Sequence, residues 1–429
     1  MLGKGKVASS TSSTGKVEIS RAVIATISAA RRDRTKARVR APSTTRSVRS
    51  EAVSAVAVRR VGASFSLDED VPFSTAPPAG LGGFGPPALS LRKGGALQVA
   101  VFDAAQVETA ADRVAVTLAD QSGGLELVQT VTLAAGGAFL FDCRLTNRGG
   151  APVTLDWLAS ALLPLPSSAE RIVSWRGRHN AELVECVEAM PRQAWLREGR
   201  RGIPGHGGPA GLLVLEQDAG HDHGLVLSLQ LAWSGDARIA VERDDEGLWA
   251  LAAGAVPAAG EIVLQPGESW SAPQAIVALS TRGRNGAMAQ QHAAVRQRIG
   301  WPQGTMRPRP VHANSWEACY FDHDETRIAE LAQACAALGV ERFVLDDGWF
   351  RGRNDDRAGL GDWTTDPAKY PQGLRPLAER INAMGMEFGL WVEPEMVNPD
   401  SDLYRAHPDW ALHLPGRDQP AARNQLVLD

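Results

Sequence analysis

Hydrophobic and polar residues change their pattern twice along the chain, and the three patterns predict three parts. Residues 1–60 are rich in Ser, Thr, Ala and Arg and lack both aromatic residues and a sustained period, so we expect a disordered basic extension. Residues 61–300 carry short apolar or alternating runs, and residues 301–429 alternate between strand-like and helix-like runs. The pattern therefore predicts two folded domains after the extension.

The runs between residues 61 and 300 have the length and alternation of β-strands. Turns that contain Gly or Pro, such as Ser122–Gly124 and Gln265–Gly267, separate them, which is typical of a large antiparallel sandwich. The predicted strands are Leu97–Phe102, Val114–Leu118, Leu125–Val131, Ala138–Leu145, Leu212–Leu215, Leu225–Leu231, Ile239–Val241 and Ile262–Leu264.

Strand and helix patterns alternate after residue 301. Apolar residues at a spacing of three and four predict a helix over Asp324–Leu338, with Asp322 and Glu325 as its start signal and Gly339 as its stop. The same spacing predicts a second helix over residues 374–384. This strand and helix order predicts parallel β/α units. The predicted strands are Arg309–Trp316, Arg342–Asp346 and Glu387–Trp391.

Composition and charge exclude several classes of protein. With 44% hydrophobic and 22% charged residues the chain has a globular composition, and no apolar run is long enough to span a bilayer, which excludes a channel or transporter. Residues 1–50 hold twelve Lys and Arg against Glu18 and Asp33, a net of +10, so the formal charge of −4 leaves −14 for the remainder. An acidic body argues against nucleic-acid binding.

The cysteines and short motifs narrow the chemistry further. The four cysteines are far apart and form no C-x-x-C pair, so we expect four buried, reduced thiols in a cytoplasmic protein rather than disulfides or a zinc–thiolate site. The chain has no P-loop, G-x-S-x-G or H-E-x-x-H motif, which argues against nucleotide binding, serine hydrolysis and zinc peptidase activity. The cysteines are Cys143, Cys186, Cys319 and Cys335.

Polar and aromatic residues follow each of the three strands predicted after residue 301. These residues are Asn314–Trp316, Asp346–Trp349 and Trp391–Glu395. Because parallel strands end at the same edge of a sheet, we expect their side chains to converge on one pocket. Carboxylates accept hydrogen bonds from neighbouring ring hydroxyls, and an indole covers the apolar face of a pyranose. The pattern favours a sugar site.

Other interpretations of the same residues remain open at this point. Asp346 and Asp347 also suit a helix cap or a pair of metal ligands, and His312 and His323 flank the first strand as further ligand candidates. Each tryptophan taken alone is more often a core residue. What favours a site is that several tryptophans coincide with strand ends.

The remaining charged residues of this region have a simpler interpretation. Glu393 and Glu395 are candidates for a catalytic acid and nucleophile, but they lie two residues apart around a proline, which favours bracing of the rim over facing carboxyls. The charged segment Arg351–Arg357 is interpreted as a solvated loop.

Six motifs over residues 310–429 carry a family resemblance through their order and spacing. They are Asn314–Glu317, Phe343–Phe350, Gly361–Trp363, Phe388–Met396, His407–Trp410 and Arg423–Asp429. Together they resemble the bacterial α-galactosidases of glycoside hydrolase family 36, and weaker similarity extends back to residue 61. The resemblance implies an antiparallel β-supersandwich over residues 61–300, followed over residues 301–429 by the first part of an incomplete (β/α)8 barrel.

The resemblance also implies a function and a set of site residues. It implies a retaining O-glycosyl hydrolase that releases terminal α-galactose from melibiose- and raffinose-type sugars, with no metal or organic cofactor. By this resemblance, two aspartates accept hydrogen bonds from sugar hydroxyls, two tryptophans pack against the galactose ring, and an arginine supplies a cationic donor. The matching substrate-binding positions of this chain are Trp316, Asp346, Asp347, Trp391 and Arg423.

Two departures from the family pattern complete the expectations. The family's nucleophile and acid/base segments follow the Arg423–Asp429 motif, so we expect both beyond Asp429 and expect a fragment that is inactive alone. Relatives form tetramers through an acidic turn, but Gly82–Gly85 lacks the acid and the arginine, which argues against that homo-oligomer. The expected partners are α-galactoside oligosaccharides. The alternative functions are a non-catalytic galactose-binding protein and a galactosyl-transferring relative.

Overall fold

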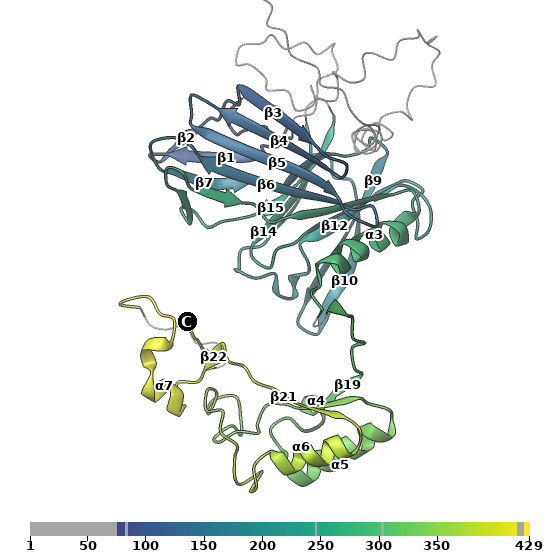
Figure 1. Ribbon diagram of the computed structural model, residues 1–429, viewed down its shortest axis with the longest axis vertical. Helices are drawn as coiled ribbons and strands as arrows, with labels where there is room; N and C mark the ends of the chain where they lie inside the picture. The colour runs from purple at the N-terminus through teal and green to yellow at the C-terminus, as the bar shows by residue number, and fades with distance from the viewer. Residues whose placement is uncertain (1–74, 82–84, 245–246, 302–303, 418–423) are drawn as a thin grey trace, which may run out of the picture. The chain divides into compact units, whose positions relative to one another are not determined.

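The computed structural model describes residues 75–81, 85–244, 247–301, 304–417 and 424–429, in which β-strands predominate over helices (Figure 1). Contacts between Cα atoms group the chain into two units, with the boundary between Gly300 and Trp301. The predicted extension over residues 1–60, most of the Gly82–Gly85 turn, and Arg423 lie outside the described residues.

The first unit is built around a ten-stranded antiparallel sheet. Its strand order is β10-β9-β12-β13-β18-β6-β5-β4-β3, and the short β17 also pairs with β6. The strands are β3 (Ala104–Thr109), β4 (Arg113–Asp120), β5 (Leu125–Leu133), β6 (Phe139–Asn147), β9 (Ala169–Arg178), β10 (Ala181–Ala189), β12 (Gly211–Glu216), β13 (Val226–Leu231), β17 (Ser269–Ser271) and β18 (Ala275–Ser280).

Two four-stranded sheets accompany the large sheet in this unit. One has the order β16-β7-β1-β2 and the other β11-β14-β15-β8. Their strands are β1 (Leu89–Lys93), β2 (Ala96–Gln98), β7 (Val153–Leu158), β8 (Ala161–Pro164), β11 (Ala194–Glu198), β14 (Ala237–Arg243), β15 (Trp249–Ala255) and β16 (Ile262–Leu264). The unit also contains the 3₁₀-helix η2 (Gly205–Gly207) and the helix α3 (Gly283–Arg298).

Alternating side chains bury one face of the ten-stranded sheet and part of the other, because successive residues of a strand point to opposite sides. In β12, Leu212 packs into a core with Ile239 of β14, whereas Leu213 faces the other way and packs with Ala287 of α3. A second core joins Leu127 of β5 to Leu155 of β7. The large sheet therefore lies between the four-stranded sheets on one face and α3 on part of the other.

The strands predicted in this region are confirmed in part. All eight overlap observed strands, but Leu97–Phe102 is wrong beyond β2, because the buried Ala100 and Phe102 reach the core from irregular backbone. The sequence did not reveal the alanine-rich β15, whose small side chains are buried at successive positions and show no alternation.

The second unit contains a parallel three-stranded sheet. Its order is β19-β20-β21, as the strand and helix pattern predicts, and α5 and α6 make the two connections. Phe343 and Leu345 of the central strand pack against Ile328 of α5 and Leu377 of α6. The elements are β19 (His312–Asn314), α5 (Glu325–Ala337), β20 (Arg342–Leu345), α6 (Arg375–Ala383) and β21 (Glu387–Leu390).

The residue that caps the start of α5 lies two positions after the predicted start signal. Asp324, not Asp322, has extended backbone and accepts a hydrogen bond from Arg327 N at 2.9 Å, which caps the first turn. Asp322 instead accepts from the Arg327 side chain at 2.7 Å. Gly339 follows the helix with a φ of +82°, in agreement with its predicted role as the stop.

The cysteines differ in part from the expectation of four buried thiols. Cys143 and Cys319 are buried but Cys186 and Cys335 are partly exposed, and all four are free thiols; burial raises the pKa of Cys143 to about 12. No helix in the described ranges combines the length and apolar character needed to cross a bilayer.

Short elements complete the second unit. They are α4 (Trp316–Cys319), β22 (Met396–Val397), α7 (Asp402–Ala406), η4 (Pro408–Trp410) and β23 (Leu426–Val427).

Candidate functional site

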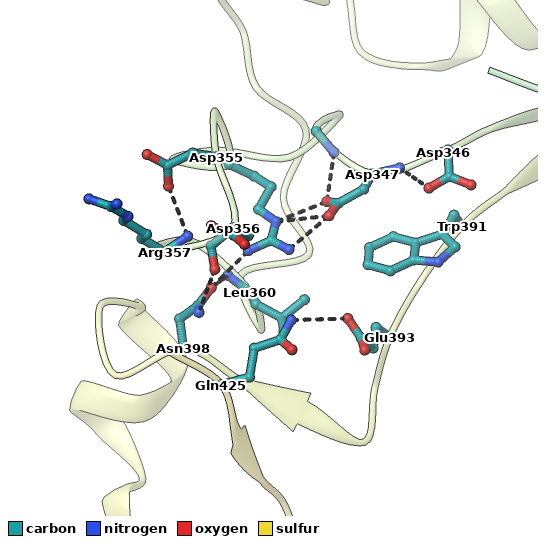
Figure 2. A network of polar contacts seen from close by, with 12 residues as sticks. Asp346, Asp347, Asp355, Asp356, Arg357, Leu360, Trp391, Glu393, Asn398 and Gln425 are labelled. Carbon is teal, nitrogen blue, oxygen red and sulfur yellow. Dashed lines mark hydrogen bonds and ion pairs between the residues drawn. The ribbon is translucent and has the colours of Figure 1, made fainter. Parts of the chain in front are cut away.

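The parallel sheet places the residues that follow its strands next to one another. Main-chain hydrogen bonds continue one residue past the strands, from Ser315 N to Val344 O at 3.1 Å and from Trp391 N to Leu345 O at 2.9 Å. Asp346 and Trp391 therefore occupy neighbouring positions at the carboxyl edge of the sheet (Figure 2).

Asp346 is 9% exposed and is held by its neighbours in the sheet. Its Oδ1 accepts a hydrogen bond from Asp347 N at 2.7 Å, and its Oδ2 accepts from the side-chain amide of Asn314. The Asn314 Oδ1 in turn accepts from Trp316 N at 2.7 Å. These two donors use about half of the acceptor positions of a carboxylate, so Asp346 keeps capacity for further donors.

Asp347 is 5% exposed and forms a buried ion pair with Arg353, which is 1% exposed. Arg353 Nε donates to Oδ1 at 2.9 Å and Nη2 donates to Oδ2 at 2.8 Å, the two-point geometry that suits a guanidinium and a carboxylate. Gly348 N donates to Oδ1 at 2.7 Å. With three donors in place, Asp347 has about one acceptor position left.

The buried amide of Asn398 continues this network. Its Oδ1 accepts from Arg353 Nη1 at 3.0 Å and from Leu360 N at 2.9 Å, and its Nδ2 donates to the carbonyls of Asn424 at 2.8 Å and Asp356 at 3.3 Å. The loop over residues 351–360 and the segment around Asn424 are thus fixed to one side chain (Figure 2).

The prediction that Arg351–Arg357 is a solvated loop is therefore wrong for Arg353. Its side chain is buried because the loop turns back and presents it to the strand-end aspartate. Gly359 permits the turn, since a Cβ there would lie 2.9 Å from Arg351 O, and its φ is +81°. The sequence feature that could have indicated this ion pair is a pair of acids followed closely by several arginines.

Three tryptophans pack together, and one of them, Trp391, lies beside the acidic pair. Trp349 is 4% exposed, and its Nε1 donates to Trp391 O at 2.9 Å. Trp363 lies 6.3 Å from Trp349 and 6.2 Å from Trp391 between ring centroids. Trp349 is thus a core residue, as a single tryptophan usually is, whereas Trp391 is only half-buried.

The predicted binding residues differ in how the structure places them. Asp346, Asp347 and Trp391 lie together (Figure 2). Trp316 is connected to Asp346 through Asn314; its ring is half-buried and packs edge-on against neighbouring aromatic rings. Arg423 lies outside the described residues.

His323, considered above as a metal ligand, has both ring nitrogens engaged. It is 5% exposed. Because the Asp347 carbonyl only accepts, Nε2 carries the proton and donates to it at 3.0 Å, and Nδ1 accepts from the Tyr370 hydroxyl at 2.8 Å. Burial lowers the pKa of His323, which favours the neutral ring. His312, the other candidate, is exposed on β19.

The other candidate carboxylates lie at the edge of the same site. Glu393 is half-buried, and Gln425 Nε2 donates to it at 3.4 Å (Figure 2). Glu395 is exposed, and its carbonyl accepts from Leu428 N at 3.0 Å. Both residues contact the segment that includes β23.

Fold and site together define a class of protein. Parallel β/α units carry their chemistry at the carboxyl ends of the strands. Here those ends hold two buried carboxylates that keep acceptor capacity, Asp346 more than Asp347, beside a half-buried indole. Convergent polar groups next to an aromatic wall are typical of carbohydrate-active proteins.

Comparison with known families is consistent with this class. The model of the glycosyl hydrolase family 36 N-terminal domain matches residues 26–265, and the Melibiase model matches residues 269–429. The chain therefore belongs to glycosyl hydrolase family 36.

The similar proteins are α-galactosidases. The chain is 38% identical over 377 residues to the α-galactosidase of Escherichia coli, covering 87% of this chain and 52% of that protein. It is 36% identical over 325 residues to α-galactosidase AgaA of Geobacillus stearothermophilus, covering 75% and 44%. The crystal structure of AgaA matches with a TM-score of 0.74 at 31% identity, covering 83% and 52%. The chain spans about half the length of the curated relatives it matches.

We expect Arg353→Ala to destabilise the second unit strongly. The substitution leaves the Asp347 carboxylate buried without its partner, which costs about 3–5 kcal/mol of unfolding free energy. Urea unfolding followed by tryptophan fluorescence measures this loss. The exposed neighbour provides a control, since Arg351→Ala is expected to change stability by less than about 0.5 kcal/mol. Equal effects of the two substitutions would contradict the buried ion pair.

We also expect the free energy of unfolding to decrease as the pH is lowered, because of His323. Burial lowers its folded-state pKa below the ordinary value of 6.5, so the unfolded chain binds the extra proton first. The neutral ring therefore contributes its full stabilisation of the folded state above pH 6.5, and this stabilisation declines as the pH falls below 6.5. Urea unfolding at pH 7.5 and 5.5 tests this. His323→Gln should reduce the pH dependence, whereas His312→Gln should leave it as in the parent.

Proposed function

We propose that this chain supplies the galactose-binding part of a retaining α-galactosidase that acts on melibiose- and raffinose-type sugars. The single observation that carries the proposal is the pair Asp346 and Asp347, buried beside Trp391 at the strand ends, in a chain whose relatives are α-galactosidases. Hydrolysis is proposed for the whole protein, and the described residues are assigned to substrate binding.

The two aspartates are assigned different tasks. Asp346 has two donors and room for sugar hydroxyls, whereas Asp347 has three donors and room for about one. Trp391 would cover the apolar face of the galactose ring. Trp316 is assigned to the wall of the same site, and Arg423 to a cationic contact with the sugar.

The architecture is proposed in the same terms. Residues 61–300 correspond to a β-supersandwich, which the ten-stranded sheet and its buried faces support. Residues 301–429 correspond to the first β/α units of a (β/α)8 barrel, which the parallel order β19-β20-β21 and its helical connections support.

The substrate class follows from the relatives. Solved variants of AgaA contain raffinose in one case, with a TM-score of 0.75 and 32% identity, and stachyose in another. We infer that the ligands of this protein are oligosaccharides with a terminal α-galactose.

Galactose binding by the purified 429-residue chain tests the proposal. We expect Asp346→Asn to weaken binding about tenfold or more, because a hydrogen bond to a charged group contributes about 1.5–3 kcal/mol. Calorimetry measures the affinity, and unfolding curves show whether the fold is retained. Asp409→Asn, at an exposed acid outside the network, should bind as the parent does.

The outcomes separate the proposal from its alternatives. A folded chain that does not bind galactose would overturn the site assignment. Binding by a protein that never hydrolyses melibiose, even at full length, would indicate a non-catalytic galactose-binding protein. Products longer than the substrate would indicate galactosyl transfer.

A further inference from the structure

A cluster of potential metal ligands lies in the first unit, at the turn end of the β9–β10 hairpin. His179, Glu182 and His206 each offer one ligand atom, and these atoms all lie within 4.8 Å of one another. His206 Nδ1 is 3.0 Å from Glu182 Oε1, and the two imidazole centroids are 5.2 Å apart. None of the three residues belongs to the strand-end site.

The hairpin backbone is bent in a way that brings Glu182 to this position. The pairing of β10 with β9 shifts between Ala181 and Val184, so Glu182 and Leu183 form a bulge, a feature that re-aims side chains. Leu183 has a φ of +54°, which is unfavourable for a branched side chain. The Glu182 carboxylate accepts from Asn180 N at 3.0 Å at the turn.

The segment that carries His206 is held tightly against the hairpin. Arg197 of β11 donates to Trp175 O at 2.7 Å and also to Gly207 O. A Cβ at Gly177 would lie 2.6 Å from Ala181 O and 2.9 Å from His206 O, and a Cβ at Gly208 would lie 2.2 Å from Trp175 O. The absence of side chains at both glycines permits this approach, so the ligand from η2 is positioned rather than loosely tethered.

The ligand set is of the kind that suits a borderline transition metal. Two imidazoles and one carboxylate, with a water in the fourth position, satisfy tetrahedral Zn²⁺, whereas Mg²⁺ and Ca²⁺ prefer all-oxygen sets. Bonds of about 2.0–2.1 Å place tetrahedral ligands about 3.3 Å apart, which exposed side chains reach by small rotations from the observed spacing.

We propose that His179, Glu182 and His206 bind one Zn²⁺ ion, which fastens the tip of the β9–β10 hairpin to residues 205–207. An exposed contact between a histidine and a glutamate alone contributes little to stability and gives no reason for a strained bulge at Leu183. A metal ion bound to three ligands from two segments stabilises the folded arrangement, because the unfolded chain does not hold those ligands together.

Calorimetric titration of the chelator-treated, full 429-residue chain with ZnCl₂ at pH 7.5 tests this site. We expect one Zn²⁺ per chain and no binding of MgCl₂. His206→Ala and Glu182→Gln should each weaken Zn²⁺ binding by more than tenfold, since loss of even an outer-shell partner costs about 10–100-fold. His292→Ala removes an exposed histidine of α3 outside the cluster and serves as the matched control.

Two further measurements keep the proposal falsifiable if one variant folds poorly. In the parent chain, Zn²⁺ affinity should be lower at pH 5.5 than at pH 7.5, because metal binding releases protons. Zn²⁺ should also raise the melting temperature of the parent but not of Glu182→Gln. Absence of stoichiometric binding, or equal losses in His292→Ala and His206→Ala, would overturn the proposal. Galactose binding should not change in any of these variants.

Discussion

The buried ion pair between Asp347 and Arg353 is the interaction on which the second unit depends. A carboxylate that is 5% exposed is stable only if its charge is paired and its lone pairs are occupied. Meeting that need fixes the path of the loop after β20, because Arg353 must return to the strand end. Asn398 then fixes the same loop to the segment near Asn424. One desolvated carboxylate thus organises several pieces of irregular chain.

The same constraint explains why two adjacent aspartates are not equivalent. Asp347 already accepts three hydrogen bonds from its own chain, and its carbonyl accepts another from His323. Lys369 Nζ donates to the next carbonyl, that of Gly348, at 2.8 Å. Asp346, one residue earlier, points along the sheet edge with fewer donors and Trp391 beside it. The more heavily bonded Asp347 holds the more open carboxylate of Asp346 in place for a ligand.

In the first unit the main constraint is the burial of a large β-sheet. Its strands bury alternate side chains against the smaller sheets and α3, and one of its irregular features is at the tip of the β9–β10 hairpin. The bulge at Glu182 and the glycines beneath η2 lie there. Strained backbone is tolerated at such an edge because the surrounding strands over-determine it.

The sequence by itself determined the features that depend on local pattern. The period of its apolar residues predicted α5, α6 and the parallel strand order, and the rule that such strands end at one edge brought Asp346, Asp347 and Trp391 together. Only the tertiary structure decided the partners of those residues. Arg353 meets Asn398 across 45 positions and His323 meets Tyr370 across 47. No short-range pattern records such pairs, because loop closure and burial, rather than spacing, select which charged side chain leaves the solvent.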